Sequence, residues 1–475
     1  MIWKTAWKNV WRNKVRSLVV MSSVTIGILG GVFAVAVMNG AVEQRVDSAL
    51  SYEIAHLHIN DPGFRDNYDI QLTIPNLEKI MSVLSETEEV EAVARRIIIN
   101  GMANTASRSA GVQIMGVVPA QEKKVFDLHE QTISGTGDFF ETESRFNLAY
   151  IGQDLAKELN IIRYVIDDDV IQKLRDRGIP EATLNKLSDF KGERFHSEDD
   201  FEKQMKETLS EKEQNEYGRA IKEEAWSFSE RARMTLTFLD RDQTQTGAVF
   251  RIAGIYDINN SAFEMSRVLI KKELLSGLTG LAENQVHQLA VRLEDMDQAK
   301  SVSSELSEQF PGLEVLSWKD IQPDLAYTTD LVTNFYAVFM IIILAALAFG
   351  IVNTMLMVVL ERTKELGMLT AIGMNKKRVF SMIMLESILL SLMGGVAGMM
   401  LSQILIMFTS NRGIRLSQFE EGFEAMGYSS HIYPEIYPGF FLTVTVLIIL
   451  TGILSSIYPA IKALKLDPAE ALRTE

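Results

Sequence analysis

The amino-acid sequence predicts an α-helical membrane protein with four transmembrane helices, arranged as one plus three, and a large mixed α/β domain inserted between the first and second helices. Four apolar runs are each long enough to cross the roughly 30 Å hydrocarbon core of a bilayer as a helix. They cover residues 18–38, 335–360, 379–408 and 438–459. Residues 39–334 hold 32 basic and 52 acidic residues, so this block is too polar for lipid and accounts for the net charge of -15.

Positive charge near the ends of the apolar runs predicts the orientation in the membrane. Residues 1–17 carry five cations and no acid, and the loop 361–378 carries five cations and two acids. We therefore expect both segments, and the tail 460–475, in the cytoplasm, with 39–334 and the short loop 409–437 on the other side. A cleaved signal peptide is the alternative for the first run, because Ala34-Val35-Ala36 resembles a cleavage site, but the run is longer than a usual signal sequence.

The first 17 residues have the pattern of an amphipathic helix. Trp3, Trp7, Val10 and Trp11 recur at helical spacing, and Lys4, Lys8 and Arg12 form a parallel basic stripe. Such a helix is expected to lie in the membrane interface, with its tryptophans among the headgroups and its cations toward anionic lipid.

The inserted domain shows two kinds of periodicity. Alternating apolar residues predict strands near 56–59, 112–117, 234–238, 249–255 and 287–293, and helical spacing appears at 75–85 and 296–310. Residues 162–230 differ, with 18 acids and 12 bases in 69 positions and few β-branched residues. We interpret this segment as a charged helical insertion, which is either a docking arm for a partner or a solvated excursion.

The residues that carry most enzyme chemistry are missing or scattered. The sequence has no cysteine, which excludes disulfides, Cys-ligated metals and a thiol nucleophile. It has no Gly-Lys dipeptide and hence no P-loop for ATP, and its acidity argues against binding nucleic acid. His56 and His58 could share a strand face and hold a metal, but an ordinary role in the sheet is the favoured alternative. We therefore expect neither an enzyme nor a bound cofactor or metal.

Two features lie inside the apolar runs. Glu386 is an ionisable residue well within a predicted span, and such residues are functional candidates unless they pair with another helix end. The pairs Gly27 and Gly31, and Gly394 and Gly398, have the four-residue spacing that lets two membrane helices approach closely. They predict helix packing and say nothing of a substrate.

The cytoplasmic loop 361–378 carries a recognisable pattern. Leu366, Leu369 and Ala371-Ile372 could form an apolar stripe on a short helix flanked by charge and punctuated by Gly367 and Gly373. A helix presented in this way can dock in a cleft of a cytoplasmic protein and transmit a rigid-body movement. A simple connector on the membrane surface is the alternative.

The motif of this loop resembles the signature of the FtsX-like permease family of ABC transporters. It reads Glu361-Arg362-x-Lys364-Glu365-Leu366-Gly367-Met368-Leu369-x-Ala371-Ile372-Gly373. Glu386-Ser387, Gly394-Gly395-x-x-Gly398, Tyr458-Pro459-Ala460 and Asp467-Pro468-Ala469-Glu470-Ala471-Leu472-Arg473 are similar to the same family. Residues 6–16 and 38–63 resemble its LolC/LolE lipoprotein-releasing subgroup in particular.

The resemblance implies a permease of the MacB-like mechanotransmission class in a bacterial inner membrane, with the large domain in the periplasm. It implies a cytoplasmic ABC ATPase dimer, which binds ATP and Mg and docks on Glu361, Arg362, Lys364, Glu365, Leu366, Gly367, Leu369 and Gly373. A second permease chain, the same or related, is expected. The subgroup implies that lipoproteins are extracted from the outer leaflet, passed to a periplasmic carrier and moved toward the outer membrane. The alternatives are a MacB-like efflux or export permease and an FtsX-like signal relay to a periplasmic enzyme.

Overall fold

The computed structural model describes residues 2–195, 197–229 and 232–465. The chain forms two compact units. One, called here the helical unit, comprises Met1–Arg45, Asp324–Glu420 and Ser429–Glu475. The other, the sheet unit, comprises Val46–Pro323 and Glu421–Tyr428.

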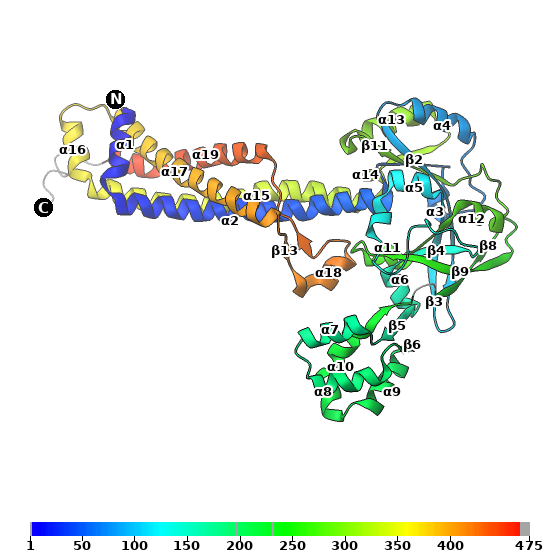
Figure 1. Ribbon diagram of the computed structural model, residues 1–475. Coiled ribbons are helices and arrows are strands. Elements are labelled where there is room, and N and C mark those ends of the chain that lie inside the picture. The colour runs from blue at the N-terminus through cyan, green and yellow to red at the C-terminus, as the bar shows by residue number, and fades with distance from the viewer. Residues whose placement is uncertain (1, 196, 230–231, 466–475) are drawn as a thin grey trace. The chain divides into compact units, whose positions relative to one another are not determined.

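The helical unit is built from long helices that lie side by side (Figure 1). Four helical stretches are long and apolar enough to cross a membrane: Lys14–Ile54, Pro323–Glu361, Lys376–Ser410 and Pro438–Leu464. The elements are α1 (Ile2–Arg12), α2 (Lys14–Ser48), α15 (Pro323–Glu361), α16 (Thr363–Ala371), α17 (Lys376–Ser410) and α19 (Pro438–Leu464). The predicted fold class, with one span before and three after a large α/β domain, is confirmed.

Helix α17 packs closely against two neighbours because it has glycine where they meet. A Cβ added at Gly394 would lie 2.8 Å from the Met21 carbonyl oxygen, and one at Gly398 would lie 2.8 Å from that of Thr25, both on α2. On another side, a Cβ at Gly395 would lie 2.6 Å from Ile448 of α19. A larger side chain at Gly394 or Gly398 would collide with the backbone of α2, whereas one at Gly395 would first displace the Ile448 side chain.

The glycines of α2 lie at its contact with a different helix, α15. A Cβ at Gly27 would lie 2.8 Å from Leu347, and one at Gly31 would lie 2.9 Å from Ile343, both on α15. A hydrogen bond from the Thr25 hydroxyl to the Gly394 carbonyl (2.9 Å) adds a polar contact between α2 and α17. Both predicted glycine pairs therefore lie at helix–helix contacts.

The sheet unit contains a nine-stranded mixed sheet in the order β12-β1-β11-β2-β3-β10-β4-β9-β8. Strand β2 pairs with β11 near its start and with β8 near its end, so the six strands from β2 to β8 close on themselves. The strands are β1 (Leu57–Asn60), β2 (Val90–Asn104), β3 (Ser109–Val117), β4 (Leu148–Gly152), β8 (Arg233–Leu239), β9 (Gln245–Tyr256), β10 (Arg267–Lys271), β11 (Gln288–Leu293) and β12 (Glu314–Ser317).

Short helices cover the sheet and connect its strands. They are α3 (Phe64–Asn67), α4 (Leu77–Glu86), α5 (Pro119–Val125), α6 (Gln153–Glu158), α11 (Ser261–Ser266), α12 (Lys272–Thr279), α13 (Ala299–Gln309) and α14 (Trp318–Ile321). In the 409–437 segment lie β13 (Ile414–Arg415), α18 (Glu420–Ala425) and β14 (His431–Ile432). Separate apolar cores, one including Ile97 and the other Ile98, contain the alternating side chains of β2.

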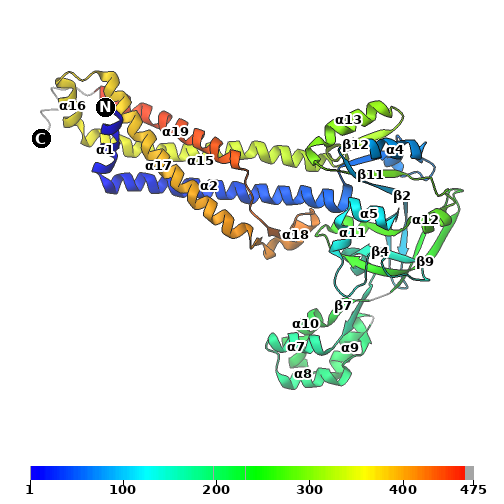
Figure 2. The same ribbon diagram turned by 45° about the horizontal axis from the view of Figure 1, so that its top comes forward.

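Residues 162–228 form a separate lobe of the sheet unit (Figure 2). Its helices are α7 (Asp168–Asp176), α8 (Glu181–Leu187), α9 (Glu198–Thr208) and α10 (Glu211–Ala225). The expectation of a purely helical insertion was incomplete, because a three-stranded antiparallel sheet stands at its base: β5 (Ile162–Val165), β6 (Arg194–Phe195) and β7 (Trp226–Phe228). Its strands have two to four residues, too few to show an alternating pattern.

The insertion leaves and rejoins the sheet unit at one place. Ile162 is paired with Phe228 across β5 and β7, so the two ends lie side by side. The lobe has its own apolar core, which includes Leu174, Leu187 and Phe201. The segment is therefore an inserted subdomain with its own core.

A buried carboxyl group in the sheet unit makes its stability depend on pH. Glu264 of α11 is 1% exposed and accepts a hydrogen bond from the backbone N–H of Ile258 (2.8 Å). Loss of solvation raises the pKa of this carboxyl group to about 7. The folded state therefore binds its proton more tightly than the unfolded chain does.

We predict that the sheet unit is more stable at pH 5 than at pH 8 by the contribution of Glu264. This contribution is fully present below pH 4.5, the pKa of the carboxyl group in the unfolded chain. It is lost as the pH rises through about 7, the pKa of the group in the folded state. It amounts to roughly 3 kcal/mol at about 1.4 kcal/mol per pKa unit. In thermal unfolding of the full chain, the difference in stability between pH 5 and pH 8 should be smaller for Glu264→Gln than for the wild type. The exposed control Glu273→Gln should behave like the wild type, and equal pH profiles for both variants would contradict the assignment.

Candidate functional site

The predicted coupling segment forms the short helix α16, which follows α15 after Arg362. Its end is set by Gly373, which has a φ of +97°. The N–H of Met374 bonds to the carbonyl of Leu369 (3.0 Å), as in a helix that closes on a left-handed glycine. Gly373 thus has a structural reason for its place in the motif, since a side chain there would be strained.

The residues of the expected apolar stripe do not all lie on one accessible face: Leu366 and Leu369 face the core of the helical unit, whereas Ile372 is exposed. Leu366 is 4% exposed and belongs to the core of the helical unit, and Leu369 packs against the same core. Gly367 is buried as well. The sequence predicts these residues to dock a partner; in the structure they pack within this chain, and the docking itself stays a prediction. The apolar stripe of a cytoplasmic helix was available to its own bundle, and the sequence pattern does not distinguish the two uses.

A different stripe of α16 and its end faces outward. Lys364, Met368 and Ile372 follow one another at four-residue spacing, which places them on one face. Met368 is 51% exposed and Ile372 is 79% exposed. We call Lys364, Met368 and Ile372 the outer stripe. These exposed apolar side chains next to a lysine form a candidate contact surface, and the sequence did not single out Met368 because its neighbours in the motif are equally apolar.

Arg362 connects the start of α16 to α17. Its Nη1 lies 3.3 and 3.4 Å from the two carboxylate oxygens of Glu386, and its Nε donates to Glu365 Oε2 (3.1 Å). The Glu386 side chain is 6% exposed and that of Arg362 is 15% exposed. Glu386, which the sequence singled out inside a span, therefore has an ionic partner at the end of another helix.

Two further ion pairs extend this network to the start of the chain. Arg12, the last residue of α1, donates to the same Glu365 oxygen (2.8 Å). Arg16 of α2 pairs with Glu361 at the end of α15 through two hydrogen bonds. The hydrogen bond from Arg12 is the main reason that the pKa of Glu365 is lowered. The network thus joins α1, α2, α15, α16 and α17, and α1 and α16 lie at the same end of the helical unit (Figure 2).

The pairs differ in what they contribute to stability. Arg12 and Glu365 have side chains 52% and 43% exposed, and pairs of this kind contribute about 0 to 1 kcal/mol. Arg362 and Glu386 are largely removed from water, so the loss of either leaves a poorly solvated charge. A pocket of about 270 Å³ beside them is lined by polar side chains that include Asn9, Asn13 and Thr354.

The two histidines considered for a metal have other partners. His56 Nδ1 accepts from the backbone N–H of Leu293 (2.9 Å), and His58 Nδ1 contacts Gln288 Nε2 (3.1 Å). Burial is the main cause that lowers the pKa of both rings. Within the described ranges no group of three or more His, Cys, Asp or Glu side chains could hold a metal ion.

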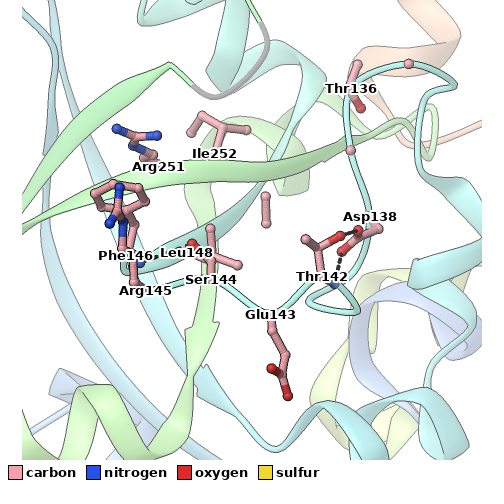
Figure 3. A pocket seen from close by; sticks show the side chains of 13 residues that line it. Thr136, Asp138, Thr142, Glu143, Ser144, Arg145, Phe146, Leu148, Arg251 and Ile252 are labelled. Atoms are coloured by element: carbon pink, nitrogen blue, oxygen red, sulfur yellow. Dashed lines mark hydrogen bonds between the residues drawn. The ribbon is translucent and has the colours of Figure 1, made fainter.

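The sheet unit has an open pocket that no sequence motif indicated. It holds about 640 Å³ between the loop 135–148 and β9. Figure 3 shows Phe146 beside Arg145 and Arg251, and the Arg251 guanidinium lies 3.6 Å from the centre of the Phe146 ring. On the other side, Asp138 accepts hydrogen bonds from the Thr142 backbone and hydroxyl. Both arginines contact the Phe146 ring as cation–π partners, with the Arg145 guanidinium 5.2 Å from the ring centre.

Comparison with known proteins identifies the class of the helical unit. Residues 337–468 match the family described as FtsX-like permease C-terminal. This range covers α16, α17 and α19, together with most of α15. The chain therefore contains an FtsX-like permease domain, in agreement with the resemblance of its cytoplasmic loop. Part of the carboxy-terminal motif, residues 467–473, lies outside the described residues.

Individual relatives belong to two kinds of transporter. Over 233 residues the chain is 30% identical to the macrolide export ATP-binding/permease protein MacB of Escherichia coli K12, covering 47% of this chain and 34% of that protein. It is 22% identical over 251 residues to the lipoprotein-releasing system transmembrane protein LolC of Xylella fastidiosa, covering 49% and 59%. It is 28% identical over 201 residues to MacB of Bordetella avium, covering 41% and 28%. The chain thus matches 28% to 59% of the length of these curated relatives.

Two solved structures also match, with a low TM-score of 0.27 each. They are the extracellular domain of the ABC-type transporter YknZ from Gram-positive bacteria, at 10% identity over 55% of this chain and 99% of that one, and the periplasmic region of MacB from Actinobacillus actinomycetemcomitans, at 9% over 57% and 91%. Four helices of the chain are long and apolar enough to cross a membrane, and MacB and LolC are its homologues. The expected inner-membrane location is consistent with the permease-domain match and with these two homologues.

We predict that Arg362→Leu lowers the thermal unfolding midpoint of the purified chain much more than Arg12→Gln does. The first change leaves Glu386 without its ionic partner in a poorly solvated place, at a cost of about 3 kcal/mol. The second removes an exposed pair, at a cost below about 1 kcal/mol. The double variant Arg362→Leu/Glu386→Leu should recover most of the loss. Equal shifts for Arg362→Leu and Arg12→Gln, or no recovery in the double variant, would contradict this account.

Proposed function

We propose that this chain is the non-catalytic permease subunit of an ATP-driven ABC transporter. Its FtsX-like permease domain is the observation that carries the proposal, together with the outer stripe of α16 at a cytoplasmic helix end. ATP and Mg²⁺ would be bound by a cytoplasmic ABC ATPase dimer and not by this chain. In this account the ATPase contacts Lys364, Met368 and Ile372, and its movement is passed to the spans through α16.

The ionic network supports this route because its poorly solvated Arg362–Glu386 pair resists independent movement of α16. Arg362 connects the helix to α17 through Glu386, and Glu365 connects it to α1 through Arg12. A push on the outer stripe would therefore displace several helices together, as interfaces with fixed packing do. A second permease chain, the same or a related one, completes the proposed transporter.

The proposed cargo is a lipoprotein, extracted from the outer leaflet and passed through a periplasmic carrier toward the outer membrane. The match to LolC, which covers 59% of that protein, favours this cargo. Each acyl CH₂ withdrawn from lipid costs about 0.8 kcal/mol, so extraction needs an energy source. The match to MacB, at 30% identity, equally favours a MacB-like efflux or export permease. An FtsX-like relay to a periplasmic enzyme is the third possibility.

Purification from native membranes under mild conditions, with and without vanadate, tests the coupling assignment. The wild-type chain should retain an ABC ATPase. Met368→Asp should lose it, because a charge in the middle of an apolar contact is not solvated there. Met368→Leu is the matched control and should retain it. The assignment is wrong if Met368→Asp retains the ATPase fully, or if the wild type retains none.

Mass spectrometry of the other retained proteins distinguishes the cargo. Acylated lipoproteins and a soluble carrier would support extraction. An adaptor and an outer-membrane duct would instead show an export permease, and a cell-wall hydrolase would show a signal relay. Each of these outcomes leaves the role of α16 intact.

A further inference from the structure

Helix α1 presents three kinds of surface around its axis. Ala6 and Val10 are fully buried in the core of the helical unit, where α1 packs on α17. Trp3, Trp7 and Trp11 are 56%, 42% and 43% exposed. Three large aromatic side chains left in contact with the surroundings, at a spacing of one helical turn, form a continuous stripe on one helix.

The cations of α1 form a second stripe beside the tryptophans. Lys4 and Lys8 are exposed, and neither makes an ion pair with a described residue. At about 100° per residue, the tryptophan stripe lies between the buried face and the lysine stripe. Going around the helix, the surface changes from protein core to aromatic to cationic.

The location of α1 limits what can cover this surface. Arg12 ends α1, and Lys14 begins α2, which is long and apolar enough to cross a membrane. The helix is therefore held at the boundary of the bilayer by the span that follows it. Tryptophan is enriched at this boundary, where its ring contacts acyl chains and its N–H reaches the headgroups, and lysines extend to the lipid phosphates.

We propose that the Trp3–Trp7–Trp11 and Lys4–Lys8 surface of α1 binds the anionic lipid of the cytoplasmic leaflet and, through the Arg12–Glu365 ion pair, braces α16 against the membrane. Charge complementarity supports lipid as the occupant, since residues 2–17 contain cations and no acid. Continuity with the membrane span supports it as well. The bracing of α16 rests on the proposed function, whereas the binding of lipid does not.

The distribution of tryptophan in the chain permits a direct test. Of the five tryptophans, three are in α1, and the other two, Trp226 and Trp318, are in the sheet unit. In the full chain carrying Trp226→Phe and Trp318→Phe, tryptophan fluorescence, excited selectively over that of tyrosine, therefore comes from α1 alone. It is reconstituted in nanodiscs of phosphatidylcholine with or without phosphatidylglycerol, using lipids brominated on the acyl chain near the headgroup.

The bromolipids should quench this fluorescence about twofold more strongly when phosphatidylglycerol is present. Lys4→Gln/Lys8→Gln in the same background should remove that difference. If the background variant does not fold, the wild type and Trp3→Phe/Trp7→Phe/Trp11→Phe are compared, and the difference in quenching reports α1. No quenching in either lipid would show that α1 is covered by protein, and equal quenching in both would exclude the anionic lipid. Both results overturn the proposal.

Arg12→Gln separates lipid binding from bracing. It should leave the bromolipid quenching unchanged, because Arg12 is paired with Glu365 and the lysines bind the lipid. Bracing also predicts that phosphatidylglycerol increases ATPase activity when the chain is reconstituted with its co-purified ATPase, and that Arg12→Gln reduces this increase. An unchanged increase would contradict bracing. Failure of any ATPase to bind would contradict the proposed function and leave the quenching result standing.

Discussion

Arg362 lies between the carboxylates of Glu365 and Glu386, and this contact brings together the ends of α15 and α16 and the interior of α17. Glu386 is well inside α17 and nearly inaccessible to water, so it needs a cation at hydrogen-bonding distance. The required partner stands just beyond α15, at the start of α16. The second acid, Glu365, is shared with Arg12, which brings α1 to the same place. In this arrangement Leu366 of α16 lies in the core of the helical unit and Met368 is exposed.

Close packing extends the constraint along the spans. The backbone of α17 approaches α2 at Gly394 and Gly398, where a methyl group would already collide. Helices in such contact cannot slide or rotate freely, since side chains that interdigitate have few alternative arrangements. A force applied at the outer stripe would thus be transmitted by helices that are joined by ion pairs at one end and packed closely at the glycine contacts farther along. The same logic makes α1, which contacts both the network and the membrane surface, a support for α16.

The features that a single physical rule determines were the ones predicted best from the sequence. The lengths of the apolar runs predicted four spans, and α/β periodicity predicted the character of the inserted domain. The helix ends differ from the ends of the predicted spans, because α2 continues to Ser48 and α15 begins at Pro323, well beyond the apolar residues. Polar residues can continue a helix outside the membrane, so the length of an apolar run does not show where its helix ends. Leu366 and Met368 show that an apolar pattern alone does not predict which side chain of a short helix is buried. Both are apolar and two residues apart, and the sequence does not show that Leu366 packs in the core while Met368 is exposed. The pocket beside Phe146 joins a loop to a distant strand and has no local pattern.

Cysteine accessibility tests the orientation of α16 most directly, because the chain has no cysteine of its own. Met368→Cys, Ile372→Cys and Leu366→Cys are each introduced alone, and open membrane fragments are treated with a water-soluble maleimide. The account predicts rapid labelling at positions 368 and 372, slow labelling at 366, and protection of the first two when the co-purified ATPase is bound. Labelling at 366 as fast as at 368, or no protection by the ATPase, would contradict the central claim that α16 presents its outer stripe to an ATPase.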